Sequence, residues 1–464
     1  MLCELPTMLF LLTNLFHVYS NWGINNNYIQ LEVKIKQLCK IRMTRVLPKP
    51  SGPYSVGCFD VSTKCGEDRC LFRLYYPTKP QEAVSSENPL WLPCKEYASG
   101  FTSFVNIPSF SWLFRWFFSS TRIPVSWNGD LQMPKSVQKL PVVLFSHGLG
   151  GIRTTYSNVC TDLASYGTLV ASIEHSDKSA SATYYLEEKV NLESGDSEKV
   201  VEKKWLPFHK VSGGEPAEHE CRNKQVRHRA AECCKTLDIL QLLNEGNLET
   251  VEGNENLHQF KNALDLEKCA VLGHSFGGGT AVAALSMDER FKVGIGLDSW
   301  MYPLDKTMYA TINPVPFLFI NSETFQWPSN VAKMRKLDSN TFNIEAQREI
   351  ITLVGTSHHS QCDFPLLLRS HFFSKSIGIS GTADPVGVAK LNNEIVRAFI
   401  GKHLGLEFGR DLESLIQENE DGIIRGSNLK LDESKIEESK EALRELKKTN
   451  YEVFFSCNRP IYPF

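Results

Sequence analysis

The sequence predicts an α/β protein in which a mostly parallel sheet carries helices on both faces. Short apolar runs have the length of strands and are continuous rather than alternating, as expected for strands that are buried on both faces. Helical patterns separate several of these runs, and such alternation is typical of parallel sheets. The expected strands span 142–145, 169–173, 270–272, 293–297, 317–320 and 350–354, and the helical patterns span 155–166, 226–240 and 392–403.

The first strands are expected to depart from this parallel order. Residues 54–61 and 71–76 alternate loosely between apolar and polar side chains, and a turn-rich, charged stretch separates them. Two such runs favour an antiparallel strand pair on the N-terminal side of the sheet. Residues 187–220 are polar and charged, which indicates an excursion over the surface.

The length and composition limit how the chain is organised. Of its 464 residues, 42% are hydrophobic and 22% are charged, which allows one large domain with extensions or two domains. We expect a main α/β domain over 49–408 and an N-terminal extension over 1–48. A charged C-terminal tail over 409–464 is expected to hold a surface helix at 431–448. The net charge of −3 argues against binding to the phosphates of nucleic acid.

The N-terminus and the cysteines point to different compartments. A signal-like segment covers 8–20, and its apolar part, 8–18, has the length of a secretory signal. Glu4 and the lack of Lys or Arg before this run argue against secretion, and the run is too short and too polar to span a bilayer. The 13 cysteines form no C-x-x-C pair and no N-x-[ST] sequon occurs. We therefore expect a cytoplasmic protein, with secretion as the alternative.

One pentapeptide, GHSFG at 273–277, carries the strongest chemical signal in the chain. It follows an apolar run and precedes the small residues at 278–281, so it lies between a strand and a helix. G-x-S-x-G in this context is typical of the nucleophile elbow of the α/β-hydrolase fold, which we therefore predict. Ser275 is the candidate nucleophile, and the flanking glycines suit a turn too tight for Cβ atoms. The alternative is a glycine-rich turn with a structural serine.

A serine nucleophile needs a base, and the base needs an acid that orients it. In this fold the three groups follow in the order Ser, Asp or Glu, His, each just after a strand. Asp298 directly follows the run 293–297, and His358 lies just beyond 350–354. His359 is the alternative base. Asp363 is a weaker rival acid because it follows the histidines and breaks the chain order.

The negative oxygen of a tetrahedral intermediate needs fixed N–H donors. One expected donor is the backbone N–H of Phe276, directly after the nucleophile. The other is the N–H of Leu149, in the glycine-rich loop 146–151 (SHGLGG) that follows the strand 142–145. The chain has no H-E-x-x-H, P-loop or EF-hand pattern. We therefore expect a mechanism without a metal or cofactor, in which calcium is dispensable.

A second unusual segment, FSWLFRWFFSS at 110–120, combines aromatic residues with a narrow polar wedge. On a helix, Ser111, Arg115 and Ser119 share one face. Such aromatic amphipathic helices lie in the membrane interface, so we expect contact with a lipid surface. The alternative is a helix buried against the core. The expected contact residues are Trp112, Leu113, Phe114, Trp116 and Phe117.

Over about 52–406 the chain resembles the platelet-activating factor acetylhydrolases of the plasma and type II intracellular kind, also called group VII phospholipases. The resemblance rests on several blocks in the same order, which makes it more specific than the pentapeptide alone. The blocks are FSHGLG at 145–150, EHSDKSASATYY at 174–185, GHSFGG at 273–278, LDSWMYPL at 297–304, FINSETF at 319–325 and GTSHHSQCDF at 355–364.

The resemblance implies that the catalytic triad is Ser275, Asp298 and His358, and that Leu149 and Phe276 donate to the oxyanion. It implies a calcium-independent esterase that removes an acetyl group, or another short or oxidised acyl group, from the sn-2 position of a phospholipid. It also implies docking on membrane or lipoprotein surfaces through helices near 110–118. Alternatives are a broad carboxylesterase or lipase, and an inactive lipid-binding relative.

Two departures from the family pattern bear on these expectations. His359 stands where we expect a different polar residue, next to the proposed base. The chain also lacks the Met-Gly start of the myristoylated members at residue 1, and the family contains both secreted and cytosolic proteins. The resemblance therefore does not predict the compartment.

Overall fold

The computed structural model describes most of the chain between residues 45 and 430. The described ranges are 45–63, 69–80, 87–135, 137–191, 198–247, 251–252, 255–337, 347–368, 375 and 379–430. The expected signal-like segment at 8–20 and the expected surface helix at 431–448 lie outside these residues.

The strands of the main domain form one mixed sheet, and the bounds of each strand follow in chain order. They are β1 (Ser55–Thr63), β2 (Leu71–Thr78), β3 (Ser126–Trp127), β4 (Leu140–Ser146), β5 (Leu169–Glu174), β8 (Val251–Glu252), β9 (Leu264–His274), β10 (Phe291–Leu297), β11 (Phe317–Ser322), β12 (Arg348–Leu353) and β13 (Ile423–Arg425). Within the described residues the order is β13-β12-β11-β10-β9-β4-β5-β2-β1-β3, with β8 beside β1.

The middle of this sheet is parallel, as the continuous apolar runs predicted. Neighbours from β5 through β4, β9, β10 and β11 to β12 all pair in parallel. The expected antiparallel pair is confirmed, because β1 pairs with β2 over Ser55↔Thr78 to Ser62↔Leu71. Strand β2 then joins the parallel part through antiparallel pairing with β5. The predicted fold class is therefore confirmed.

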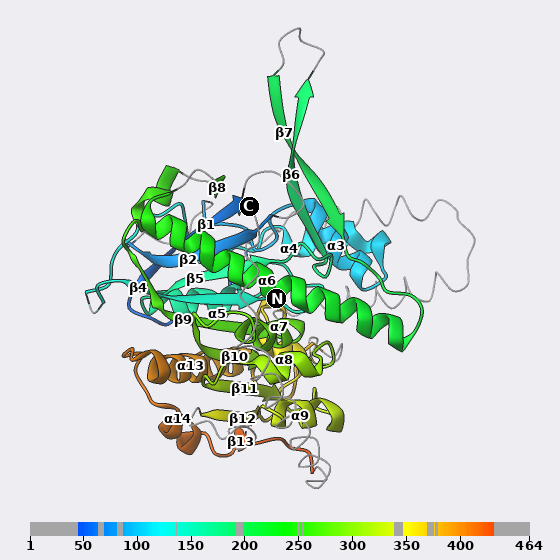
Figure 1. The fold of residues 1–464 in the computed structure, drawn as a ribbon, viewed down its shortest axis with the longest axis vertical. Helices are drawn as coiled ribbons and strands as arrows, with labels where there is room; N and C mark the ends of the chain where they lie inside the picture. Colours follow the sequence, from blue (N-terminus) through cyan, green and yellow to red (C-terminus); the bar gives the residue numbers. More distant parts are fainter. Residues whose placement is uncertain are drawn as a thin grey trace, which may run out of the picture. The chain divides into compact units, whose positions relative to one another are not determined.

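Helices pack on both faces of the sheet (Figure 1). Their bounds are α3 (Lys95–Phe104), α4 (Ser111–Phe118), α5 (Ser157–Ser165), α6 (Glu215–Glu245), α7 (Phe276–Leu285), α8 (Lys306–Thr311), α9 (Pro328–Arg335), α11 (Phe364–Leu367), α13 (Pro385–Leu404) and α14 (Leu412–Glu418). Short 3₁₀ turns are η1 (Pro108–Phe110), η2 (Glu255–Phe260) and η3 (His358–Gln361). No helix in the described ranges is both long and apolar enough to cross a membrane.

The strands divide the interior into two hydrophobic cores. Because neighbouring side chains of a strand point to opposite faces, Val143 and Phe145 of β4 join the core under α5 and α13. Val142 and Leu144 join the core under α6 and α7. Both sets are fully buried. The functional residues expected from the sequence lie at the carboxyl ends of the strands between these cores.

The polar region 187–220 contains more regular structure than the sequence suggested. Strands β6 (Ala182–Asn191) and β7 (Glu198–Pro207) form a separate antiparallel hairpin, and α6 begins at Glu215. Residues 201–204 of β7 are all exposed, on both faces of the hairpin. Their side chains therefore do not alternate between buried apolar and exposed polar positions. The period-two signal of a half-buried strand is therefore absent from this segment.

The sheet also continues beyond residue 408, where the sequence placed the end of the main domain. Helix α14 buries Leu412, Leu415 and Ile416 in the core under α13. Strand β13 then pairs antiparallel with β12. The first part of the expected tail therefore adds an edge strand to the main sheet.

Candidate active site

Ser275 lies in a sharp turn between the end of β9 and the start of α7. Its backbone has φ 56° and ψ −115°, a conformation that non-glycine residues rarely adopt. A Cβ on Gly273 would lie 2.1 Å from the Gly277 carbonyl oxygen, and a Cβ on Gly277 would lie 1.9 Å from the carbonyl oxygen of Ser146. Both positions therefore require glycine, and the backbone of the turn lies in close contact with the end of β4.

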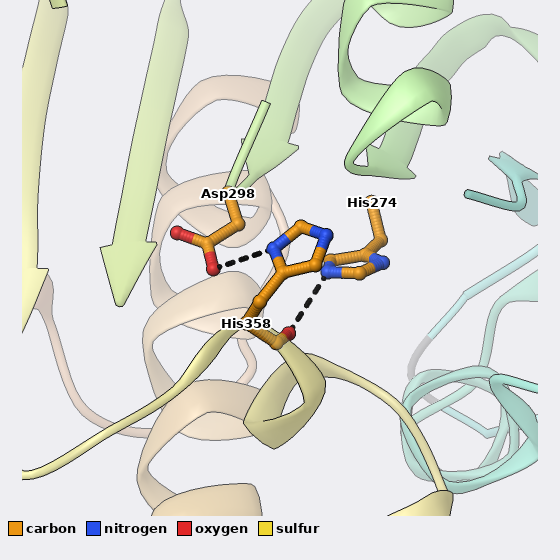
Figure 2. Close-up of side chains that lie close together, drawn as sticks. All are labelled: His274, Asp298 and His358. Atoms are coloured by element: carbon orange, nitrogen blue, oxygen red, sulfur yellow. Dashed lines mark hydrogen bonds and ion pairs between the residues drawn. The ribbon is translucent and has the colours of Figure 1, made fainter. Parts of the chain in front are cut away.

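The structure brings Ser275, His358 and Asp298 into one hydrogen-bonded row. His358 Nε2 lies 3.0 Å from Ser275 Oγ, and His358 Nδ1 lies 3.0 Å from Asp298 Oδ2. Figure 2 shows the Asp298 carboxylate, at the end of β10, facing the imidazole of His358 at the start of η3. Asp298 is fully buried, and His358 is partly exposed. This row has the geometry of a nucleophile, a general base and an orienting acid.

Burial sets the protonation states of this row. Desolvation raises the pKa of Asp298 to about 6, and hydrogen bonds from the backbone and hydroxyl of Ser322 oppose that rise. Burial, with a smaller effect of neighbouring His359, lowers the pKa of His358 below that of a free imidazole. At neutral pH the carboxylate is therefore ionised and the imidazole is neutral. A general base must be in this state to accept the serine proton.

A second histidine supports the backbone of the first. His274 Nε2 lies 3.1 Å from the carbonyl oxygen of His358, and this contact is visible in Figure 2. A carbonyl only accepts, so Nε2 carries the proton and Nδ1 accepts from the Tyr156 hydroxyl at 2.8 Å. The same hydroxyl accepts from the N–H of Gly148 at 3.0 Å. Burial lowers the pKa of His274 well below its usual range, which keeps this chain of hydrogen bonds neutral.

The side chains of His274, Asp298 and His358 lie close enough together to suggest a metal site, since their ligand atoms are within 4.8 Å of one another. The four ring nitrogens of His274 and His358, however, already take part in hydrogen bonds. The nitrogens that carry protons in these bonds offer no lone pair to a cation. The donor set therefore fits a proton-transfer row better than a metal centre.

The two residues expected to supply the oxyanion donors lie on either side of the Ser146–Gly277 contact. Phe276 is the first residue of α7 and is buried, whereas Leu149 lies in the loop after β4 and is half-buried. Arg229 of α6 holds both parts. Its Nη1 donates to the carbonyl oxygen of His147 at 2.7 Å, and its guanidinium lies 4.3 Å from the centre of the Phe276 ring.

The rival residues have other partners. His359 lies beside His358, with ring centres 5.9 Å apart, and its pKa is lowered by burial. Asp363 is buried and accepts three hydrogen bonds, from Trp91 Nε1 at 2.9 Å and from the backbone N–H groups of Ser157 and Asn158 at 2.8 and 3.0 Å. Asp363 therefore caps the start of α5.

The aromatic segment forms α4, and most of its large side chains face the protein. Phe118 is buried, and Phe114 stacks on Phe101 with ring centres 5.4 Å apart. Trp112 is 48% exposed, and Val105 and Ile107, which precede α4, are 55% and 42% exposed. The remaining expected lipid-contact residues, Leu113, Trp116 and Phe117, are half-buried. The exposed apolar surface here is therefore narrower than the helical pattern suggested.

Sequence reasoning missed several residues that support the site. Tyr156 and Arg229 reach it from α5 and α6, and no motif marks either residue. Ser322 is the last residue of β11 and lies beside Asp298, so the polar end of a neighbouring strand was an available signal. Phe325 stacks on the His358 ring at 3.6 Å between centres and belongs to the block at 319–325.

The protonation states predict the acid side of the pH–rate profile. If His358 is the base and Asp298 its orienting acid, activity needs neutral His358 beside ionised Asp298, and uptake of one proton by the pair removes this state. With the pKa of Asp298 at about 6 and the pKa of His358 lowered, kcat/KM should be nearly constant above about pH 7 and fall below it with an apparent pKa of about 6. Steady-state hydrolysis of a soluble ester across this range measures it. An acid midpoint above pH 7 under conditions where circular dichroism shows folded protein would contradict the assignment.

The two buried aspartates predict different outcomes for the same substitution. Asp298→Asn should lower kcat by about 10⁴-fold, because an amide does not hold the required imidazole tautomer. Its melting temperature should be close to that of Asp363→Asn, because each amide relieves the desolvation of a buried carboxylate and loses one acceptor for buried donors. Asp363→Asn is the matched control. It loses one acceptor for the N–H donors, so the free energy of unfolding should fall by about 1–3 kcal/mol while kcat stays within a few-fold. If Asp363→Asn lost turnover and kept its stability, the assignment of Asp298 as the orienting acid would be wrong.

Comparisons with known proteins agree with this geometry. A sequence model of the family described as platelet-activating factor acetylhydrolase, isoform II, matches residues 40–422. The platelet-activating factor acetylhydrolase of Canis lupus familiaris is 38% identical, with 84% of each chain covered. The protein of the same name from Gallus gallus is 37% identical, over 83% of this chain and 90% of the relative.

A solved structure shares the fold at low sequence identity. The ferulic acid esterase from Streptomyces cinnamoneus superposes with a TM-score of 0.54 at 16% identity, covering 82% of this chain and 99% of the esterase. This likeness supports the α/β-hydrolase architecture alone. Because the family model spans most of the chain and the curated relatives exceed one third identity, the chain belongs to the platelet-activating factor acetylhydrolase, isoform II, family.

Proposed function

We propose that this protein is a serine esterase that removes the sn-2 acetyl group, or another short or oxidised acyl group, from platelet-activating factor and related phospholipids. The observation that carries the proposal is the row Ser275–His358–Asp298, with 3.0 Å at both junctions, on a strained strand-to-helix turn. Membership of the acetylhydrolase family supports the choice of substrate.

The reaction begins when Ser275 Oγ attacks the acyl carbonyl and His358 Nε2 takes the serine proton. Asp298 stabilises the resulting imidazolium and holds its tautomer. The tetrahedral intermediate collapses, the ester bond to the glycerol oxygen breaks, and His358 returns the proton to that oxygen. Water, deprotonated by His358, then hydrolyses the acyl-serine and releases the carboxylic acid.

The negative oxygen of each intermediate is assigned to the backbone N–H groups of Leu149 and Phe276. Fixed donors in a buried site stabilise such an oxygen strongly, and removing one typically costs about 10²–10³ in kcat. The Ser146–Gly277 contact and Arg229 support this assignment, because they hold the two donor segments together before substrate arrives.

We further propose that catalysis needs no calcium. The proton is handled by His358, and the developing charge is met by N–H donors, so every step has a protein group to perform it. The hydrogen bonds of all four ring nitrogens of His274 and His358 support this view, because two of the nitrogens carry protons and the lone pairs of the other two accept from hydroxyl groups.

We also propose that the enzyme works in the cytoplasm and touches a lipid surface with the exposed side chains of Val105, Ile107 and Trp112. These three residues are exposed and close together along the chain, and tryptophan is enriched at the membrane interface. In the described part of the chain no disulfide joins two cysteines, which supports a reducing compartment.

Release of acetate from platelet-activating factor in EDTA tests the function directly. Wild-type protein should hydrolyse it, and Ser275→Ala should lower the rate by about 10⁴-fold or more because the nucleophile is gone. Ser286→Ala, which removes a hydroxyl at the end of α7 that bonds only the Ala283 carbonyl oxygen, should retain the wild-type rate. A fluorophosphonate probe should label Ser275 in both active proteins.

Long-chain phosphatidylcholine and a triglyceride serve as parallel substrates in this assay. Preference for the long acyl chains would replace the proposal by a lipase or a broad carboxylesterase. Folded wild-type protein that hydrolyses none of these substrates and resists the probe would indicate an inactive lipid-binding relative.

The proposed lipid contact predicts a defect that depends on the physical state of the substrate. Trp112→Ala should lower activity on phospholipid vesicles about tenfold or more, since burying a large apolar side chain contributes about 1.5–3 kcal/mol. Hydrolysis of a soluble acetyl ester should be unchanged. Trp127→Ala, on β3 and also exposed, is the control. Vesicle co-sedimentation measures binding directly, and equal binding by the two variants would exclude this surface.

A further inference from the structure

A pocket with a volume of about 660 Å³ opens between α3, α4 and the segment at the end of β7. Figure 1 shows α3 and α4 beside the base of the β6–β7 hairpin. Its size falls in the range of small-molecule sites. None of the residues that line it belongs to the Ser275–His358–Asp298 row, so the pocket is separate from the proposed catalytic groups.

One wall of this pocket is aromatic and held in place. Phe104 and Phe208 meet edge to face with ring centres 4.8 Å apart. Trp205 packs edge to face on buried Tyr97 at 5.2 Å. Half-buried Phe104, Trp205 and Phe208 thus present a fixed apolar surface, which suits a hydrocarbon chain.

The other lining side chains give the pocket an excess of positive charge. Lys95, Arg115 and Lys210 line it and are exposed at its opening, against a single acid, Glu96. Lys95 and Glu96 approach each other at 4.0 Å, and Lys210 donates to the side-chain oxygen of Asn106 at 2.8 Å. The charge complement of this arrangement is an anionic group.

We propose that this pocket binds a single-chain lipid with an anionic head. The chain lies along Phe104, Trp205 and Phe208, and the head lies between Arg115 and Lys210. A carboxylate and a phosphate monoester share the required chemistry, so a fatty acid and a lysophosphatidate are the two sources to be distinguished. A zwitterionic choline head lacks the net negative charge.

Binding to the full chain is measured by titration calorimetry with lipid monomers, below the concentration at which micelles form. The probes are palmitate, 1-palmitoyl lysophosphatidate and 1-palmitoyl lysophosphatidylcholine. Ser275 is first modified with a fluorophosphonate, so that lipid bound at the proposed active site does not contribute. The anionic probes should bind at least tenfold more tightly than the choline lipid, and the tighter of the two identifies the head group.

Two variants test the location. Arg115→Gln combined with Lys210→Gln should weaken binding of the anionic probes at least tenfold and leave binding of the choline lipid unchanged. Ser99→Trp, which places an indole at the pocket wall, should abolish binding. Lys261→Gln combined with Lys390→Gln removes the same charge from exposed sites outside the pocket and should leave affinity unchanged. Melting temperatures confirm that each variant is folded.

Phe104 is left unchanged in these variants because its ring supports the neighbouring loop, where a Cβ on Gly150 would lie 2.6 Å from it. Equal binding of all three lipids, or no effect of the pocket variants, would overturn the proposal. Loss of binding after modification of Ser275 would do the same, by assigning the lipid to the active site. Since no step requires turnover and the pocket variants lie outside the Ser275–His358–Asp298 row, failure of the pocket variants to act is distinguishable from failure of the proposed esterase activity.

Discussion

The contact between the end of β4 and the serine turn is the constraint on which the rest of the site depends. The Ser146 carbonyl oxygen lies where a Cβ on Gly277 would be, at 1.9 Å. Only glycine allows the two backbones to come this close, and the approach brings the loop with Leu149 beside the start of α7. Strands β4 and β9 pair in parallel, and their register determines where along the strands the two segments meet.

Buried polar groups around this contact form hydrogen bonds with the backbone of the site. Arg229 bonds the backbone of the loop that holds Leu149, and His274 bonds the backbone of His358. Burying such groups is favourable only when their hydrogen bonds are satisfied, so each partner restricts the position of the next. The same burial keeps His358 neutral at physiological pH. The groups that keep the site rigid therefore also keep His358 in the protonation state that the proposed mechanism requires.

The sequence predicted the parts of the structure that local patterns encode. Continuous apolar runs identified the parallel strands, and the position of Asp298 and His358 after strands identified the residues that meet Ser275. The β6–β7 hairpin was missed because its exposed strands lack a one-sided apolar pattern. Tyr156 and Arg229 were missed because their roles depend on packing between α5, α6 and the turn, which no local spacing records.

The aromatic helix α4 shows a further limit of pattern reasoning. Apolar side chains occupy most of the circumference of α4, so the pattern does not show which side of the helix faces the protein. The structure resolves this through Phe101, which stacks on Phe114 from α3. Trp112 is left exposed on the other side.

The way the sheet ends has a consequence for the behaviour of shortened chains. Within the described residues the outermost strands are very short, with β3 covering Ser126–Trp127 at one side and β13 covering Ile423–Arg425 at the other. Short edge strands offer few unpaired backbone groups to another molecule. A chain cut after residue 408 would uncover the longer strand β12, whose Ile351 and Leu353 now pair with β13. Self-association through added strands would then compete with folding.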